Sequence, residues 1–152
     1  MKIRFIVTLI FVYIVLDTST AFSGDGFYLN PGFKFSYIFG DHGGYTMGLE
    51  ISYTSYSAER IYGIVASADY CRNAERFRYH LGGEYQVVEL GPTFINENGS
   101  HDLGISVTPY FGVFVIPYYC YTFRSAKPGL HELGSFLKLP ILLKGSGFHF
   151  GG

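Results

Sequence analysis

The chain has 152 residues, of which 15% are charged and 19% are aromatic, and its formal net charge is −1. Soluble domains usually contain about 25% charged residues, so this composition disfavours a protein whose whole surface is hydrated. The net charge also gives no sign of the basic surface that nucleic-acid-binding proteins use to contact phosphates, so we expect no nucleic-acid partner.

The beginning of the chain has the layout of a cleavable secretory signal peptide. A short basic segment is followed by the apolar residues 5–16 and by the small-x-small triplet Ala21-Phe22-Ser23. The apolar run is shorter than the roughly 20 residues that a helix needs to span a bilayer, so we favour cleavage after the triplet over an uncleaved anchor. We therefore expect a signal peptide at 1–23 and one domain at 24–152.

Regular alternation of apolar and polar residues begins at Phe33, after a lead-in segment at 25–31. Successive side chains of a strand point to opposite faces, so this alternation predicts strands at 33–39 and 45–56. A loop rich in Gly and Asp separates the two strands. The second segment alternates most strictly, and its apolar members are Tyr45, Met47, Leu49, Ile51 and Tyr53.

Six further strands are predicted by the same rhythm, at 61–70, 77–85, 88–95, 103–115, 118–124 and 131–142. The corner between the sixth and seventh is expected at Ile116-Pro117. No apolar stretch after residue 23 is long enough for a membrane helix, so any spanning structure must be a closed barrel. The sequence therefore predicts an all-β fold, an eight-stranded antiparallel up-and-down transmembrane β-barrel.

The connections between the predicted strands differ in composition. The odd-numbered ones are polar, and the even-numbered ones are short or poor in loop residues. Membrane barrels have longer external loops at one end and tight periplasmic turns at the other. We therefore expect the odd-numbered connections to be external; they lie at 40–44, 71–76, 96–100 and 125–130.

With its signal peptide, its loop asymmetry and strand sequences such as Tyr45–Tyr53 and Leu81–Tyr85, the chain resembles the small eight-stranded outer-membrane barrel proteins of Gram-negative bacteria. The resemblance covers most of residues 27–142, and no motif names a subfamily. It implies location in the cell outer membrane, with outer-membrane lipid and the outer-membrane assembly machinery as partners. Such proteins often end on an aromatic residue, whereas this chain continues to Gly152, and Phe150 is the candidate replacement.

Charged residues on the polar faces of the strands should point into the barrel. Eight strands enclose a lumen only wide enough for side chains, so we expect these charges to pair and fill it. The alternative is a proton relay or a catalytic carboxylate pair, in which His80 and Glu132 on the same face could take part. The structural network that we predict comprises Lys34, Glu50, Arg78, Glu84 and Lys138.

Histidine and cysteine spacing indicates neither a metal site nor a cofactor site. His42, His101 and His131 lie in or beside predicted external loops, but none has a second His or Cys at the i, i+2 or i, i+4 spacing of a local ligand pair. Cys71 and Cys120 fall on strands at opposite sides of the predicted ring, whereas a disulfide needs Cα atoms within roughly 7 Å. We therefore expect free or buried thiols.

No catalytic motif is present, so we expect no catalytic residues and no enzyme. The leading hypothesis is a monomeric outer-membrane barrel with a structural or surface-contact role, in which any activity lies in the odd-numbered loops. One alternative is an enzyme that modifies outer-membrane lipid, with His80 or His131 as its base. Two others are a narrow pore, which the lumen width opposes, and a secreted lipocalin-like barrel that binds an apolar ligand, which the low charge content opposes.

Overall fold

A computed structural model describes residues 25–40, 43–57, 60–112 and 115–145. The signal peptide expected at 1–23 and Phe150 lie outside these residues. The strands are β1 (Gly26–Phe39), β2 (Gly44–Tyr56), β3 (Ile61–Cys71), β4 (Arg76–Tyr85), β5 (Val88–Glu97), β6 (Ser100–Pro109), β7 (Val115–Arg124), β8 (Leu130–Lys138) and β9 (Ile141–Gly145), with a 3₁₀ turn at Arg72–Ala74.

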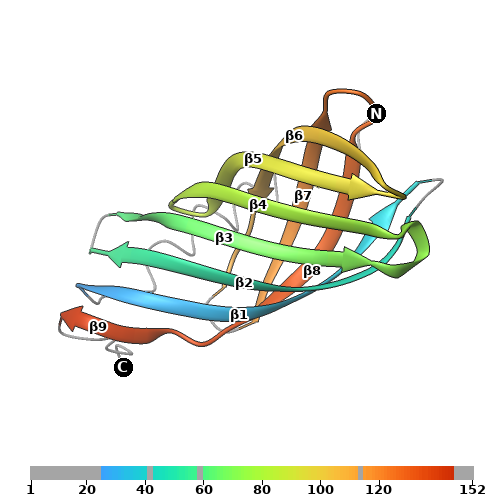
Figure 1. Ribbon diagram of the computed structural model, residues 1–152. Helices are drawn as coiled ribbons and strands as arrows, with labels where there is room; N and C mark the ends of the chain where they lie inside the picture. The colour runs from blue at the N-terminus through green and yellow to red at the C-terminus, as the bar shows by residue number, and fades with distance from the viewer. Residues whose placement is uncertain (1–24, 41–42, 58–59, 113–114, 146–152) are drawn as a thin grey trace, which may run out of the picture.

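The sheet closes on itself because β1 has partners on both edges (Figure 1). From β1 to β8, each strand pairs antiparallel with the next, and β1 also pairs with β8 from Gly32–Lys138 to Phe39–His131. Closure gives backbone groups partners within the protein, which a bilayer requires. The predicted all-β, eight-stranded antiparallel barrel is therefore confirmed, with one strand added.

The additional strand β9 continues β8 along the same edge of β1. It pairs from Leu29–Ile141 to Gly26–Gly145, and the Leu139 N–H bridges the gap by donating to the Pro31 carbonyl at 3.0 Å. Pro140 interrupts the strand because proline has no N–H to donate. Residues 26–31 of the predicted lead-in are therefore part of β1, and that prediction was wrong for them, because β2 and β9 supply partners on the two sides of this segment.

Two other predicted boundaries were wrong. Strand β6 ends at Pro109, and Pro117 lies inside β7 opposite Ser135, so the corner falls at 110–114 and not at Ile116-Pro117. Gly112 supplies the turn there, with φ +117°. The polar segment 96–100 reduces to the two-residue turn Asn98-Gly99, whose φ angles of 52° and 75° are typical of a type I′ hairpin.

The predicted difference in loop length was also wrong. We define the loop end of the barrel as the end that carries the connections 40–43, 72–75, 98–99 and 125–129. The opposite end, the β9 end, carries 57–60, 86–87 and 110–114. The two sets are similar in length because polar residues that were predicted to lie in loops, such as Arg76, Glu97 and Ser100, belong to the ends of strands.

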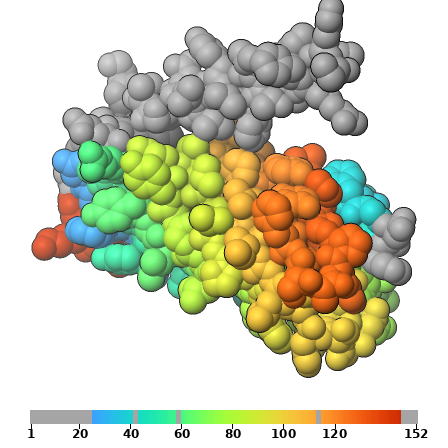
Figure 2. All heavy atoms as spheres, turned by 90° about the horizontal axis from the view of Figure 1, so that it is seen from above, coloured from blue at the N-terminus to red at the C-terminus, as the bar shows by residue number. Residues whose placement is uncertain are grey.

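The barrel is apolar outside and polar inside. Along β2, Leu49 is 60% exposed and Met47 63%, whereas the neighbouring Glu50 is 4% and Thr46 1% exposed. In Figure 2 the colours pass in chain order across the visible surface, as expected when sequence neighbours pair around a ring. A continuous exposed apolar surface over a polar interior is the arrangement of a barrel whose outer face lies in lipid.

Aromatic side chains collect near both ends of this outer face. Tyr62 pairs with Tyr85 at the β9 end, while Tyr37 packs against Tyr45 and Tyr70 against Phe77 at the loop end. Such girdles are typical of the two interfaces of a membrane. Exposed aliphatic residues lie between them: Leu49, Ile51, Ile64, Leu81, Leu90, Ile105 and Leu137. Within the described ranges, no helix has the length and apolar character needed to cross a bilayer.

Arginine substitutions on β2 test the lipid-facing surface. Leu49→Arg places a charge near the middle of the apolar band, so we expect a loss of about 2–4 kcal/mol in the free energy of unfolding. Tyr45→Arg adds the same charge at the strand end, where the cost should be at most about 1 kcal/mol. Urea unfolding in lipid vesicles measures the free energy of unfolding of both variants. Equal losses for the two would contradict the assignment of Leu49 to the middle of the lipid-facing apolar band.

Candidate functional site

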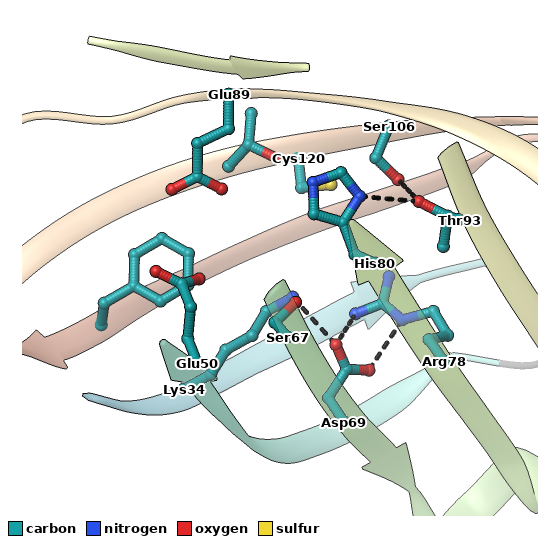
Figure 3. Close-up of a pocket in the computed structure, with 12 residues that line it drawn as sticks. Lys34, Glu50, Ser67, Asp69, Arg78, His80, Glu89, Thr93, Ser106 and Cys120 are labelled. Atoms are coloured by element: carbon teal, nitrogen blue, oxygen red, sulfur yellow. Dashed lines mark hydrogen bonds and ion pairs between the residues drawn. The ribbon is translucent and has the colours of Figure 1, made fainter. Parts of the chain in front are cut away.

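Four charged residues from four strands meet near the middle of the lumen; we call them the central cluster. Asp69 on β3 lies opposite Arg78 on β4 and accepts from its Nε at 2.7 Å and its Nη2 at 3.0 Å. Lys34 on β1 donates to Asp69 Oδ2 at 2.9 Å, the same oxygen that accepts from Arg78 Nη2 (Figure 3). Glu132 on β8 completes the cluster, 2.5 Å from Arg78 and 3.3 Å from Lys34.

The central cluster is neutral and buried. Its two cations and two carboxylates are each at most 8% exposed at the side chain. Buried charges cost free energy unless partners and hydrogen bonds compensate. Here each charged group contacts at least two others, and Tyr118 also donates to Glu132. The arrangement fits a structural tie between β1, β3, β4 and β8.

A second cluster lies toward the β9 end. Lys138 pairs with Glu50 at 2.5 Å and lies 3.6 Å from Glu89. Glu84 behaves differently from our expectation, because it makes no ion pair with a described residue and accepts hydrogen bonds from Tyr110 and Thr54 instead. This β9-end cluster therefore holds three carboxylates and one cation.

A third cluster closes the loop end. Glu97 accepts from Arg76 at 2.7 Å, from Arg124 at 2.8 Å and from Lys127 at 3.1 Å. Arg124 also donates to Asp102 at 2.9 Å, and Ser125 donates to the same carboxylate at 2.6 Å. This loop-end cluster joins β4, β5, β6 and β7 to the connection at 125–129.

The remaining lumen is filled by rings and hydroxyl groups. Phe136 stacks on Tyr118, and Lys138 Nζ lies 4.9 Å from the Phe136 ring centre. On the other wall, a hydroxyl chain runs from His80 to Thr93 at 3.0 Å, on to Ser106 at 2.5 Å and to Thr122 at 2.8 Å (Figure 3). The cavity between these walls measures about 10 Å³, which is room for about one water molecule.

The predicted network residues fall into two groups and not one. Lys34 and Arg78 belong to the central cluster, whereas Glu50, Glu84 and Lys138 belong to the β9-end cluster. All five are buried.

Sequence reasoning missed several partners for three different reasons. Asp69 and Glu89 stand on the polar parity of their strands, so alternation alone could have identified them. Arg76 and Glu97 were assigned to loops, and only the observed register makes them cross-strand neighbours. Asp102 and Arg124 were missed because both lie near strand ends, where too few alternating residues follow to show which face a side chain is on.

The two cysteines are buried and form no disulfide with each other, and Cys120 Sγ lies 3.8 Å from the Thr122 hydroxyl. His131 contacts the Tyr119 hydroxyl at 2.6 Å, and His101 stacks on Phe94, while His42 lies outside the described residues. In the part of the chain that the structure describes, no three His, Cys, Asp or Glu side chains are grouped as metal ligands.

The chain matches no protein-family model and no curated protein. Among solved structures it is similar to a chain titled "De novo design of transmembrane beta-barrels". The identity is 10% and the TM-score is 0.43, over 74% of this chain and 95% of that one. The closed barrel itself is defined by the antiparallel pairing of its strands.

Removing one carboxylate tests the central cluster. Asp69→Asn leaves Lys34 and Arg78 with Glu132 as their remaining anion, so we expect a loss of about 3–5 kcal/mol in unfolding free energy. Glu75→Gln removes the same charge from an exposed site and should change stability by less than about 0.5 kcal/mol. Denaturant titration in detergent micelles gives both values, and a loss below 1 kcal/mol for Asp69→Asn would show that the charges are not coupled.

Proposed function

We propose that this protein is an outer-membrane β-barrel of a Gram-negative bacterium with a structural or surface-contact role and no enzymatic activity. The observation that carries the proposal is a lumen filled at three levels by buried charge clusters beneath an apolar outer face. Side chains that bind one another across the lumen tie its walls together. A rigid, closed barrel of this kind is suited to hold the connections at its two ends in fixed positions, where they can contact other molecules.

Burial and packing disfavour the alternatives. A lipocalin-like barrel needs an apolar interior, whereas here the buried side chains include many charged residues and the apolar ones face outward. A pore needs a water-filled passage, and the charge clusters occupy the lumen. For a lipid-modifying enzyme, His80 and Thr93 form a base–hydroxyl pair, but the cavity beside them, about 10 Å³, is too small for a lipid.

The location and orientation follow from the sequence and the strand number. The expected signal peptide supports export, and the assembly machinery of the outer membrane is the expected partner for insertion of a monomer. Because the barrel has an even number of strands, β1 begins and β9 ends at the same end. We place that end in the periplasm and the loop end outside.

Planar-bilayer recording tests the filled lumen. The purified protein should give conductance at the background level of the bilayer, because the clusters leave no continuous water path. An unrelated porin prepared in the same detergent serves as the positive control. A steady, size-selective conductance would contradict the structural role.

Tag accessibility tests the proposed location and orientation. An epitope inserted between Asn98 and Gly99 should be labelled by antibody on intact cells, since this hairpin is at the loop end. The same epitope inserted after Ser57 should be labelled only after the outer membrane is permeabilised. The opposite pattern would reverse the orientation, and labelling of neither tag after permeabilisation would place the protein elsewhere.

A further inference from the structure

A pocket of about 520 Å³ opens at the loop end, above the loop-end cluster. Its wall comes from segments far apart in the sequence: the end of β1 at Phe39, the turn at Asn98 and the connection at Pro128. Arg76, Glu97 and Arg124 also line it. The pocket is therefore formed only when the barrel closes, and no short sequence motif could reveal it.

The charges that line the pocket are not balanced. Among the described residues that line it, there are three cations, Arg76, Arg124 and Lys127, and one carboxylate, that of Glu97, so their formal charge is 3 − 1 = +2. The Asp102 carboxylate offsets part of the positive charge of Arg124, but Asp102 itself does not line the pocket. An anion entering the pocket would therefore meet an excess of positive charge in a partly enclosed space, where water screens it less than at an open surface.

Two of the cations that line the pocket have hydrogen-bond donors beyond those that contact Glu97 and Asp102. Lys127 is 38% exposed at the side chain and contacts Glu97, so its ammonium, which has three donors, keeps further N–H groups for a ligand. Arg124 donates through Nε to Asp102 and through Nη2 to Glu97, which leaves the two N–H groups of Nη1 beyond these bonds. The two glutamate contacts fix both cations in place before a ligand binds.

From this arrangement we propose that the loop-end pocket binds a phosphate monoester. A doubly charged phosphate has three acceptor oxygens, which suit an ammonium and a guanidinium held side by side by one carboxylate. Phe39 and Leu130 provide apolar wall for the group that carries the phosphate. The carrier is either a lipid head group or a soluble phosphate ester. The proposal goes beyond the structural role and depends on the barrel's fold only.

Calorimetric titration of the purified full chain distinguishes the two carriers. Glycerol 3-phosphate is titrated into protein in nanodiscs of phosphatidylcholine, and in a second series nanodiscs containing phosphatidic acid compete with it. We expect saturable binding at low salt that weakens as ionic strength rises. Loss of glycerol 3-phosphate binding in the phosphatidic acid discs would identify the lipid head group as the ligand, and unchanged binding would identify the soluble ester.

Charge variants test the residues. Lys127→Ala removes one charge-assisted hydrogen bond at the rim and should weaken glycerol 3-phosphate binding about tenfold or more. Lys144→Ala removes the same charge from the exposed strand β9 at the other end and should leave binding unchanged.

Three results would overturn the proposal: no binding by the wild type in any disc, no effect of Lys127→Ala, or equal weakening by both lysine variants. Each of these would leave the structural role standing if the protein is non-conducting. If the barrel conducts and binds glycerol 3-phosphate through Lys127, the structural role is contradicted and the proposed phosphate site stands.

Discussion

The pairing of β1 with partners on both of its edges is the constraint on which the rest of the structure depends. Without it, the backbone groups of the two edge strands would face lipid unpaired, and an open sheet cannot remain in a bilayer. Pro31 and Pro140 lie together at the one place where β8 gives way to β9. The N–H and C=O of a strand residue point to the same side, and the Pro31 carbonyl accepts from Leu139 there. The donor missing from Pro31 therefore falls at this interruption of the seam.

Closure with eight strands also determines what the interior can contain. The lumen is too narrow for bulk water, so polar residues on the inward parity must satisfy one another. They do so unevenly along the barrel axis. The central cluster is neutral, the β9-end cluster has Glu50, Glu84 and Glu89 around Lys138, and the loop-end cluster has more cations than carboxylates. Carboxylates therefore outnumber cations toward the β9 end and cations outnumber carboxylates toward the loop end, so the loop end is the better place for an anionic ligand.

Alternation in the sequence was enough to predict the fold class and the path of most strands. The segment from Tyr45 to Tyr56 was predicted as a strand because its period of two is unbroken from Tyr45 to Thr54 and its two faces differ in polarity. Prolines were misleading: Pro117 was taken as a corner although it lies within β7, and Pro31 was taken as a lead-in although it lies within β1. A proline's missing donor is compatible with a strand wherever the ladder is interrupted, and only the pairing shows where that is.

The pairing of the charges could not be predicted for a related reason. Parity shows that Lys34 and Glu50 point inward, but not that Lys34 meets Asp69 or that Lys138 meets Glu50. Those partners depend on the register between strands and on the tilt of the barrel, which place residues far apart in the sequence at one level. The loop-end pocket depends on the same register, and the sequence analysis had assigned its residues to separate strands and loops.

Spin labels on β2 test most directly the central claim that the protein is an inside-polar barrel embedded in lipid. Single cysteines replace Thr46, Met47, Leu49, Ile51 or Ser52 in a chain whose Cys71 and Cys120 are changed to alanine, and each labelled protein is reconstituted into vesicles. Collision with dissolved oxygen should be high at 47, 49 and 51, and collision with a water-soluble nickel complex should be low there. Labels at 46 and 52 should be shielded from both. Strong collision with the nickel complex at 49 and 51 would contradict the account, because the apolar face would then lie in water.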